Sequence, residues 1–211
     1  MIRMGEKLWV ICEYLLLIAV PTLLMQDIRV LAYRPLIMGL TIVYISFMAW
    51  RKRYTLPALG LRTDNFLLAL GHVLPGSILV IIGMSLVAYL LPRTVVVPLL
   101  GADGLAFPLL VRLVMYIFAS VPVQEMIYRG YLMLRLEVVS ASNTGAGVLA
   151  AVAFTLGHVP FQSPLMLGVA LILGVMYLGS YRRDHNLLAL CVSHAFIGAS
   201  LMLVRNSLVP F

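Results

Sequence analysis

The sequence predicts an all-α protein, a polytopic transmembrane helical bundle of about seven to eight spans with a buried polar site, given that about 20 apolar residues suffice for one span. Hydrophobic residues make up 63% of the 211 positions and charged residues only 11%. Soluble domains are about half apolar and about a quarter charged. The apolar runs lack strand-like alternation, and only helices or closed barrels satisfy their backbone hydrogen bonds in lipid.

Almost the whole chain lies in or beside hydrophobic runs, so a single integral membrane domain is expected over residues 1–211. Its N-terminal spans occupy residues 1–104, and residues 105–205 form a motif-bearing core. The net charge of +7 would indicate nucleic acid binding in a soluble protein. Here the basic residues lie in short loops, where they set membrane orientation, so no nucleic acid partner is expected.

Three spans are predicted in the N-terminal part, at residues 8–25, 35–50 and 66–91. The first contains Glu13, for which a position near the membrane interface is favoured over one facing the bundle. Residues 92–104 are rich in proline and glycine and are expected to form a loop.

The C-terminal part begins with an apolar segment, 105–138, that is longer than a span requires. It is interpreted as one long tilted helix or as two pieces broken at Pro122. Further spans are expected at 147–159, 164–180 and 187–204. In the first of these, Gly147 and Ala151 have the small-xxx-small spacing that permits close helix contact.

Lysine and arginine in the short loops predict an N-terminus in the cytoplasm and an odd number of spans. The chain lacks an ER retrieval tail, so a bacterial inner membrane is expected. The cytoplasmic set comprises Arg3, Lys7, Arg51, Lys52, Arg53, Arg62, Arg135, Arg182 and Arg183, and the smaller opposite set comprises Arg29, Arg34, Arg93, Arg205 and, if it reaches the outer interface, Arg112.

Glu125 and Arg129 are the polar pair around which the chain is organised. On a helix they share one face and can neutralise each other. An ion pair that holds the bundle together is one interpretation. The other is a catalytic carboxylate, because an ionisable residue at membrane depth marks a candidate functional site.

Two histidines are expected at a similar depth. At about 1.5 Å per helical residue from the cytoplasmic ends, Glu125, His158 and His194 lie roughly 20, 22 and 16 Å deep. Such a group can activate water with Glu125 as general base, bind a metal such as zinc, or form a structural hydrogen-bond network. A Ser193–His194 dyad is not expected, because neighbours on a helix point in different directions.

The segments QEMIYRG, FTLGH and LLALCVSHAFIGA resemble the three motifs of the CAAX prenyl protease 2 and bacteriocin-processing (CPBP, Abi-type) family of intramembrane proteases. Those motifs are Glu-Glu-x-x-x-Arg, Phe-x-x-x-His and His-x-x-x-Asn. The resemblance extends over roughly residues 105–203. It implies an all-helical membrane bundle with a buried peptidase site.

The resemblance assigns catalytic roles to Glu125, His158 and His194 and supporting roles to Gln124, Arg129, Phe154 and Gly198. In the family the first motif glutamate and the second-motif histidine are thought to activate water, while the third-motif histidine and asparagine stabilise the oxyanion. Here the first glutamate is Gln124, which is no base, and the asparagine is Gly198, which has no side-chain donor.

Two functions are consistent with these residues. In the first, the protein is an intramembrane endopeptidase of membrane-associated peptides or proteins, with water activated by Glu125 and His158 and the oxyanion stabilised by His194. No cofactor is expected, zinc bound by Glu125, His158 and His194 being the alternative. In the second, the protein is catalytically inactive and acts as a membrane immunity or scaffold protein. A transporter carries less weight, because no internal repeat is found.

Overall fold

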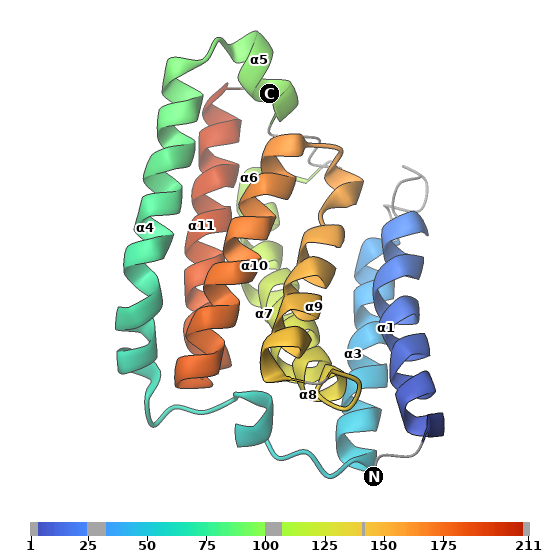
Figure 1. Ribbon diagram of the computed structural model, residues 1–211. Coiled ribbons are helices and arrows are strands. Elements are labelled where there is room, and N and C mark those ends of the chain that lie inside the picture. The colour runs from blue at the N-terminus through green and yellow to red at the C-terminus, as the bar shows by residue number, and fades with distance from the viewer. Residues whose placement is uncertain (1–3, 25–32, 100–106, 141, 209–211) are drawn as a thin grey trace.

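The computed structural model describes residues 4–24, 33–99, 107–140 and 142–208. Within these ranges the regular structure is entirely helical, which confirms the predicted all-α class. The helices run along a common direction, and α1 begins at the opposite end of the bundle from the end of α11 (Figure 1). The expected ends of two spans, at residues 25 and 105, and the side chains of Arg3 and Arg29 lie outside the described residues.

The separate long helices are α1 (Met4–Leu24), α3 (Arg34–Arg51), α4 (Phe66–Leu90), α9 (Asn143–Leu156), α10 (Pro164–Asp184) and α11 (Leu187–Leu208). In the described part of the chain, five helices are long and apolar enough to cross a membrane: Phe66–Leu90, Leu109–Leu136, Thr144–Phe161, Pro164–Asp184 and Leu187–Leu208. These match the expected third to seventh spans. The second expected span is a shorter apolar helix, Leu36–Arg51.

A continuous helix carries the Glu125 motif, so the interpretation as two pieces broken at Pro122 is wrong. Its successive parts are α6 (Leu109–Met115), η2 (Tyr116–Ser120), α7 (Val121–Glu125), η3 (Met126–Tyr131) and α8 (Leu132–Leu136).

The segments η2 and η3 are π-helical turns. The N–H of Val121 accordingly bonds to the carbonyl of Tyr116, five residues back. A proline ring clashes with the carbonyl four residues before it. The π turn widens the helix just ahead of Pro122 and lets the helix continue. Such turns often accompany functional sites.

The expected loop at 92–104 contains a short helix, α5 (Arg93–Leu99), so the prediction of loop is wrong for these residues. Pro92 stands just before the helix, and its carbonyl accepts from the N–H groups of Val95 and Val96. A proline is tolerated there, because the first helical residues need no N–H partner. The connection between α3 and α4 holds the short 3₁₀ helix η1 (Pro57–Leu59).

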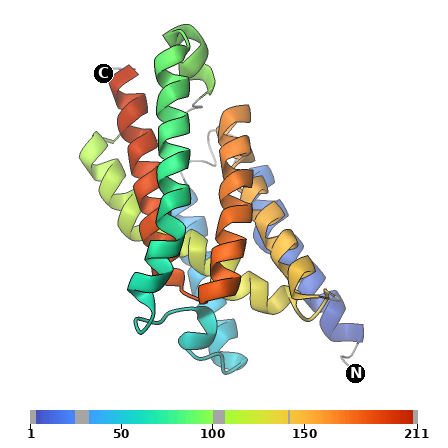
Figure 2. The ribbon, with the colours of Figure 1, turned by 60° about the vertical axis from the view of Figure 1, so that its left-hand side comes forward.

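Small residues allow α9 and α10 to pack closely together. A Cβ added at Gly147 would collide with the Leu178 side chain, and one at Gly174 would lie 3.2 Å from the carbonyl oxygen of Ala151. The close contact predicted from Gly147 and Ala151 is therefore confirmed. On the other side of the bundle α11 packs along α4 (Figures 1 and 2).

Glu13 on α1 does not lie at the interface as expected. Its exposed fraction is 3%. The carboxylate accepts hydrogen bonds from Tyr44 on α3, from Tyr131 on η3 and from Arg135 on α8. Burial of both ions is favourable only with such additional hydrogen bonds. This polar cluster attaches α1 and α3 to the motif helix.

Candidate active site

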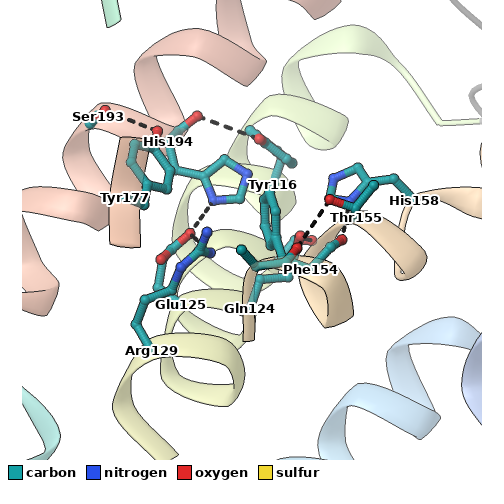
Figure 3. Close-up of polar contacts among 12 residues, drawn as sticks. Tyr116, Gln124, Glu125, Arg129, Phe154, Thr155, His158, Tyr177, Ser193 and His194 are labelled. Atoms are coloured by element: carbon teal, nitrogen blue, oxygen red, sulfur yellow. Dashed lines mark hydrogen bonds and ion pairs between the residues drawn. The ribbon is translucent and has the colours of Figure 1, made fainter. Parts of the chain in front are cut away.

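Glu125 is the last residue of α7, and its side chain is fully buried. Its Oε1 atom lies 3.0 Å from Nη1 of Arg129, one turn along the same helix, and 2.7 Å from Nδ1 of His194 on α11. Figure 3 shows the carboxylate between these two groups. The other oxygen, Oε2, is also buried and has no hydrogen-bond partner among the residues that the structure describes. The carboxylate is thus fixed through one oxygen, and the second retains its acceptor capacity.

Arg129 compensates the buried charge of Glu125 and lies among aromatic rings. Its guanidinium carbon is 4.1 Å from the ring centroid of Phe154 and 5.1 Å from that of Tyr177. Aromatic faces attract a cation, and the attraction is stronger when water is excluded. Phe154, the first residue of the second motif, therefore supports the first motif directly.

The imidazole of His194 is held by Glu125 and by aromatic rings. Because a carboxylate only accepts, the Nδ1–H of His194 is the donor to Glu125. The ring centroid lies 5.5 Å from that of Phe154, 5.9 Å from that of Tyr177 and 6.0 Å from that of Tyr116. This packing fixes the ring and directs Nε2 away from Glu125 (Figure 3).

His158 follows the end of α9 and is half-buried. Its Nδ1–H donates to the carbonyl oxygen of Phe154 at 2.8 Å, and the two rings are 4.7 Å apart. The ring of Phe154 thereby contacts both imidazoles, His158 and His194. The structure connects His158 to the Glu125–His194 pair through this ring.

The two positions that depart from the motifs have defined environments. Gln124 is half-buried, and its amide donates to Ser120 Oγ at 2.8 Å. Gly198 lies against Tyr116, because a Cβ atom built on it would collide with the Tyr116 hydroxyl group. Gln124 therefore brings an amide in place of the motif carboxylate, and Gly198 brings no side chain in place of the asparagine.

The Ser193 hydroxyl forms hydrogen bonds with Ser77 and Tyr177 and not with His194, in keeping with the prediction that Ser193 and His194 form no dyad. Its hydroxyl lies 2.6 Å from that of Ser77 and 2.9 Å from that of Tyr177. This buried hydroxyl chain joins α4, α10 and α11. We interpret these hydrogen bonds as structural, since they join three helices.

Tyr116 and Tyr177 were not predicted as site residues. Both are tyrosines in apolar helices and belong to none of the three motifs. The sequence marks them only as tyrosines within apolar segments. Such a position suggests a polar neighbour, because a buried tyrosine hydroxyl usually finds a hydrogen-bond partner.

A zinc centre is the alternative interpretation of Glu125, His158 and His194, because their side chains are common zinc ligands. Among the residues that the structure describes, no three His, Cys, Asp or Glu side chains are grouped so as to hold a metal ion. In addition, the Arg129 guanidinium already lies beside the carboxylate, and a second cation there would be repelled. The residues present therefore fit a metal poorly.

Comparison with known proteins gives one match. Residues 106–200 match the family model described as type II CAAX prenyl endopeptidase Rce1-like. The comparisons with curated proteins and with solved structures gave no match. The matched segment begins just before α6, ends within α11 and contains all three motifs. This part of the chain is therefore similar to the Rce1-like, type II CAAX prenyl endopeptidases, in agreement with the resemblance of its three motifs.

Proposed function

We propose that the protein is an intramembrane endopeptidase in which Glu125 activates the attacking water. One observation carries this proposal. The carboxylate is fixed through Oε1 by Arg129 and His194, while the buried Oε2 has no hydrogen-bond partner within the described part of the chain. A general base needs a fixed position and an unoccupied acceptor atom, and Oε2 meets both conditions.

In this mechanism Oε2 takes a proton from water, assisted by His158, as the oxygen attacks the carbonyl carbon of the peptide. The electron pair of the carbonyl moves to its oxygen, and the proton then passes to the leaving amine. His194 donates to the oxyanion through Nε2–H. This role requires the imidazolium form, because Nδ1–H is already bonded to Glu125.

The substrate is a membrane-embedded or membrane-associated peptide or protein, because the base is buried within a helix long and apolar enough to cross the bilayer. The protein is an integral membrane protein, for which we propose the bacterial inner membrane and a cytoplasmic N-terminus. The basic residues of the α3–α4 connection and of the last turn of α10 support this orientation. Both lie at the end of the bundle where α1 begins (Figure 1).

The test is cleavage of a library of tagged membrane peptides, with and without C-terminal prenyl groups, by the purified protein. Glu125→Gln keeps the size of the side chain and an oxygen for Arg129 and His194, so the variant should fold and lose cleavage. Glu137→Gln is the matched control, because Glu137 is an exposed carboxylate directly after the end of the same helix. Substantial cleavage by Glu125→Gln contradicts the assignment.

The second candidate function is an inactive membrane protein that binds a peptide or a partner protein, as an immunity or scaffold protein does. The observation in its favour is that Gln124 supplies no second carboxylate, its amide being bonded to Ser120, and that Gly198 supplies no side-chain donor. Gln124→Glu separates the two functions. Cleavage gained only in that variant would identify the natural chain as a binder, whereas cleavage by the unaltered chain supports the peptidase.

A further inference from the structure

Tyr116 occupies the space that a side chain at position 198 would take. Gly198 stands one turn after His194 on α11, and a Cβ atom there would collide with the hydroxyl oxygen and two ring carbons of Tyr116. The phenol of Tyr116 therefore fits here because residue 198 has no side chain. The phenol brings a hydroxyl group from η2 to this position.

The same hydroxyl belongs to the surroundings of His194. The Tyr116 ring meets the imidazole edge to face, at an interplanar angle of 82°. Its O–H is directed at the carbonyl oxygen of His194 at 3.5 Å, the long end of a hydrogen bond. Figure 3 shows the imidazole with Glu125 on one side and Tyr116 on the other. The hydroxyl thus lies on the side of the ring that Nε2 faces.

Peptide hydrolysis at this site needs donors for the carbonyl oxygen as it becomes negative. Two other neutral donors are engaged elsewhere, because Gln124 bonds to Ser120 and Tyr177 pairs with Ser193. His194 donates through Nε2 only as the imidazolium. A phenol keeps its proton up to about pH 10, and its O–H can rotate from a long bond to a better acceptor.

We propose that Tyr116 is a catalytic residue that donates its O–H to the oxyanion together with His194, in place of a side chain at position 198. This inference rests on the proposed peptidase function and names a donor for it. No covalent bond to Tyr116 forms. The phenol keeps its proton, and the oxyanion returns its electron pair to carbon when the amine leaves.

The test compares Tyr116→Phe with the unaltered protein. The change removes one oxygen and keeps the ring against His194 and Gly198. We expect kcat to fall by about 10²–10³, the usual effect of one oxyanion donor, with KM and the melting temperature nearly unchanged. Tyr181→Phe is the matched control, since Tyr181 is a buried tyrosine whose hydroxyl has no hydrogen-bond partner in residues 4–24, 33–99, 107–140 and 142–208.

Two further measurements distinguish a hydrogen bond from Tyr116 to the oxyanion from a role of the Tyr116 ring in packing. A phosphonate built on a peptide that the protein cleaves mimics the oxyanion, and Tyr116→Phe should weaken its binding by about 10²–10³ without weakening binding of the peptide itself. In Tyr116→Ala the space beside residue 198 is open. The double variant Tyr116→Ala/Gly198→Asn should recover at least part of the cleavage lost in Tyr116→Ala.

The outcomes for Tyr116 and for the proposed function are distinguishable when Glu125→Gln is assayed in parallel. Cleavage that is lost in Glu125→Gln but proceeds at the unaltered kcat in Tyr116→Phe overturns the role of Tyr116 and leaves the peptidase in place. No cleavage by the unaltered protein and by Gln124→Glu alike overturns both. Loss in both Glu125→Gln and Tyr116→Phe, with phosphonate binding weakened, supports both.

Discussion

Nδ1 of His194 lies 2.7 Å from Oε1 of Glu125, and this contact joins residues that are 69 positions apart in the chain. It holds the motif helix against α11 within the bundle. Arg129, a permanent cation on the same helix as Glu125, donates a hydrogen bond to the same oxygen. The charge of Glu125 and the position of its free oxygen therefore depend on both partners.

Arg129→Ala should lower the stability of the folded protein. The change leaves Glu125 buried without its cation, and removal of one partner of a buried pair costs about 3–5 kcal/mol. Chemical denaturation in detergent, followed by circular dichroism, measures the loss. Arg182→Ala, at an exposed arginine of α10, should have little effect, and equal stability of the two variants would contradict the prediction.

Glu13→Ala should destabilise the protein by a similar amount, about 3–5 kcal/mol. Arg135 is 1% exposed and loses its carboxylate partner, and Tyr44 and Tyr131 lose their acceptor. Because this cluster is separate from Glu125, cleavage per folded molecule should not change. A large fall in kcat at unchanged stability would show that the cluster acts on the site instead.

Ser193→Ala should retain cleavage, since the Ser193 hydroxyl is bonded to Ser77 and Tyr177. Leaving these buried groups unsatisfied costs about 1–3 kcal/mol of stability. The measurement is a cleavage assay beside a melting curve, with a serine-directed phosphonofluoridate added to the unaltered protein. Loss of activity in the variant, or inactivation by the reagent, would point to a serine nucleophile.

Prolonged dialysis against a chelator should leave cleavage unchanged. The oxygen of Glu125 that faces His194 also bonds to Arg129, and a guanidinium repels a divalent cation placed at the same atom. Cleavage with and without chelator, and again after added Zn²⁺, measures the effect. Loss that zinc restores would instead identify Glu125, His158 and His194 as metal ligands.

The helical class and the positions of the five described helices that are long and apolar enough to cross a membrane were predictable, because apolar runs of this length leave little alternative in lipid. The pairing of Glu125 with Arg129 followed from helical spacing. The burial of Glu13 did not, because its partner Arg135 is 122 residues away and no local pattern joins them. The short helix at Arg93–Leu99 was missed because prolines at both ends indicate a loop equally well.

Tyr116 was not predictable from the spacing of a regular helix. At about 100° per residue, positions 116 and 125 lie roughly half a turn apart in an α-helix. A π turn absorbs one extra residue and rotates the remainder of the helix, which brings the two side chains toward one face. The apolar sequence of η2 carries no signal for such a turn.

The Glu13–Arg135 contact also shows which part of the chain the motif-bearing segment needs in order to fold. The segment that matches the endopeptidase family begins at residue 106 and includes Arg135 but not Glu13. Expressed by itself, this segment would retain every motif residue and yet carry a buried guanidinium with no counter-ion from α1. The first helix, which has no motif of its own, is therefore a structural part of the unit that carries the three motifs.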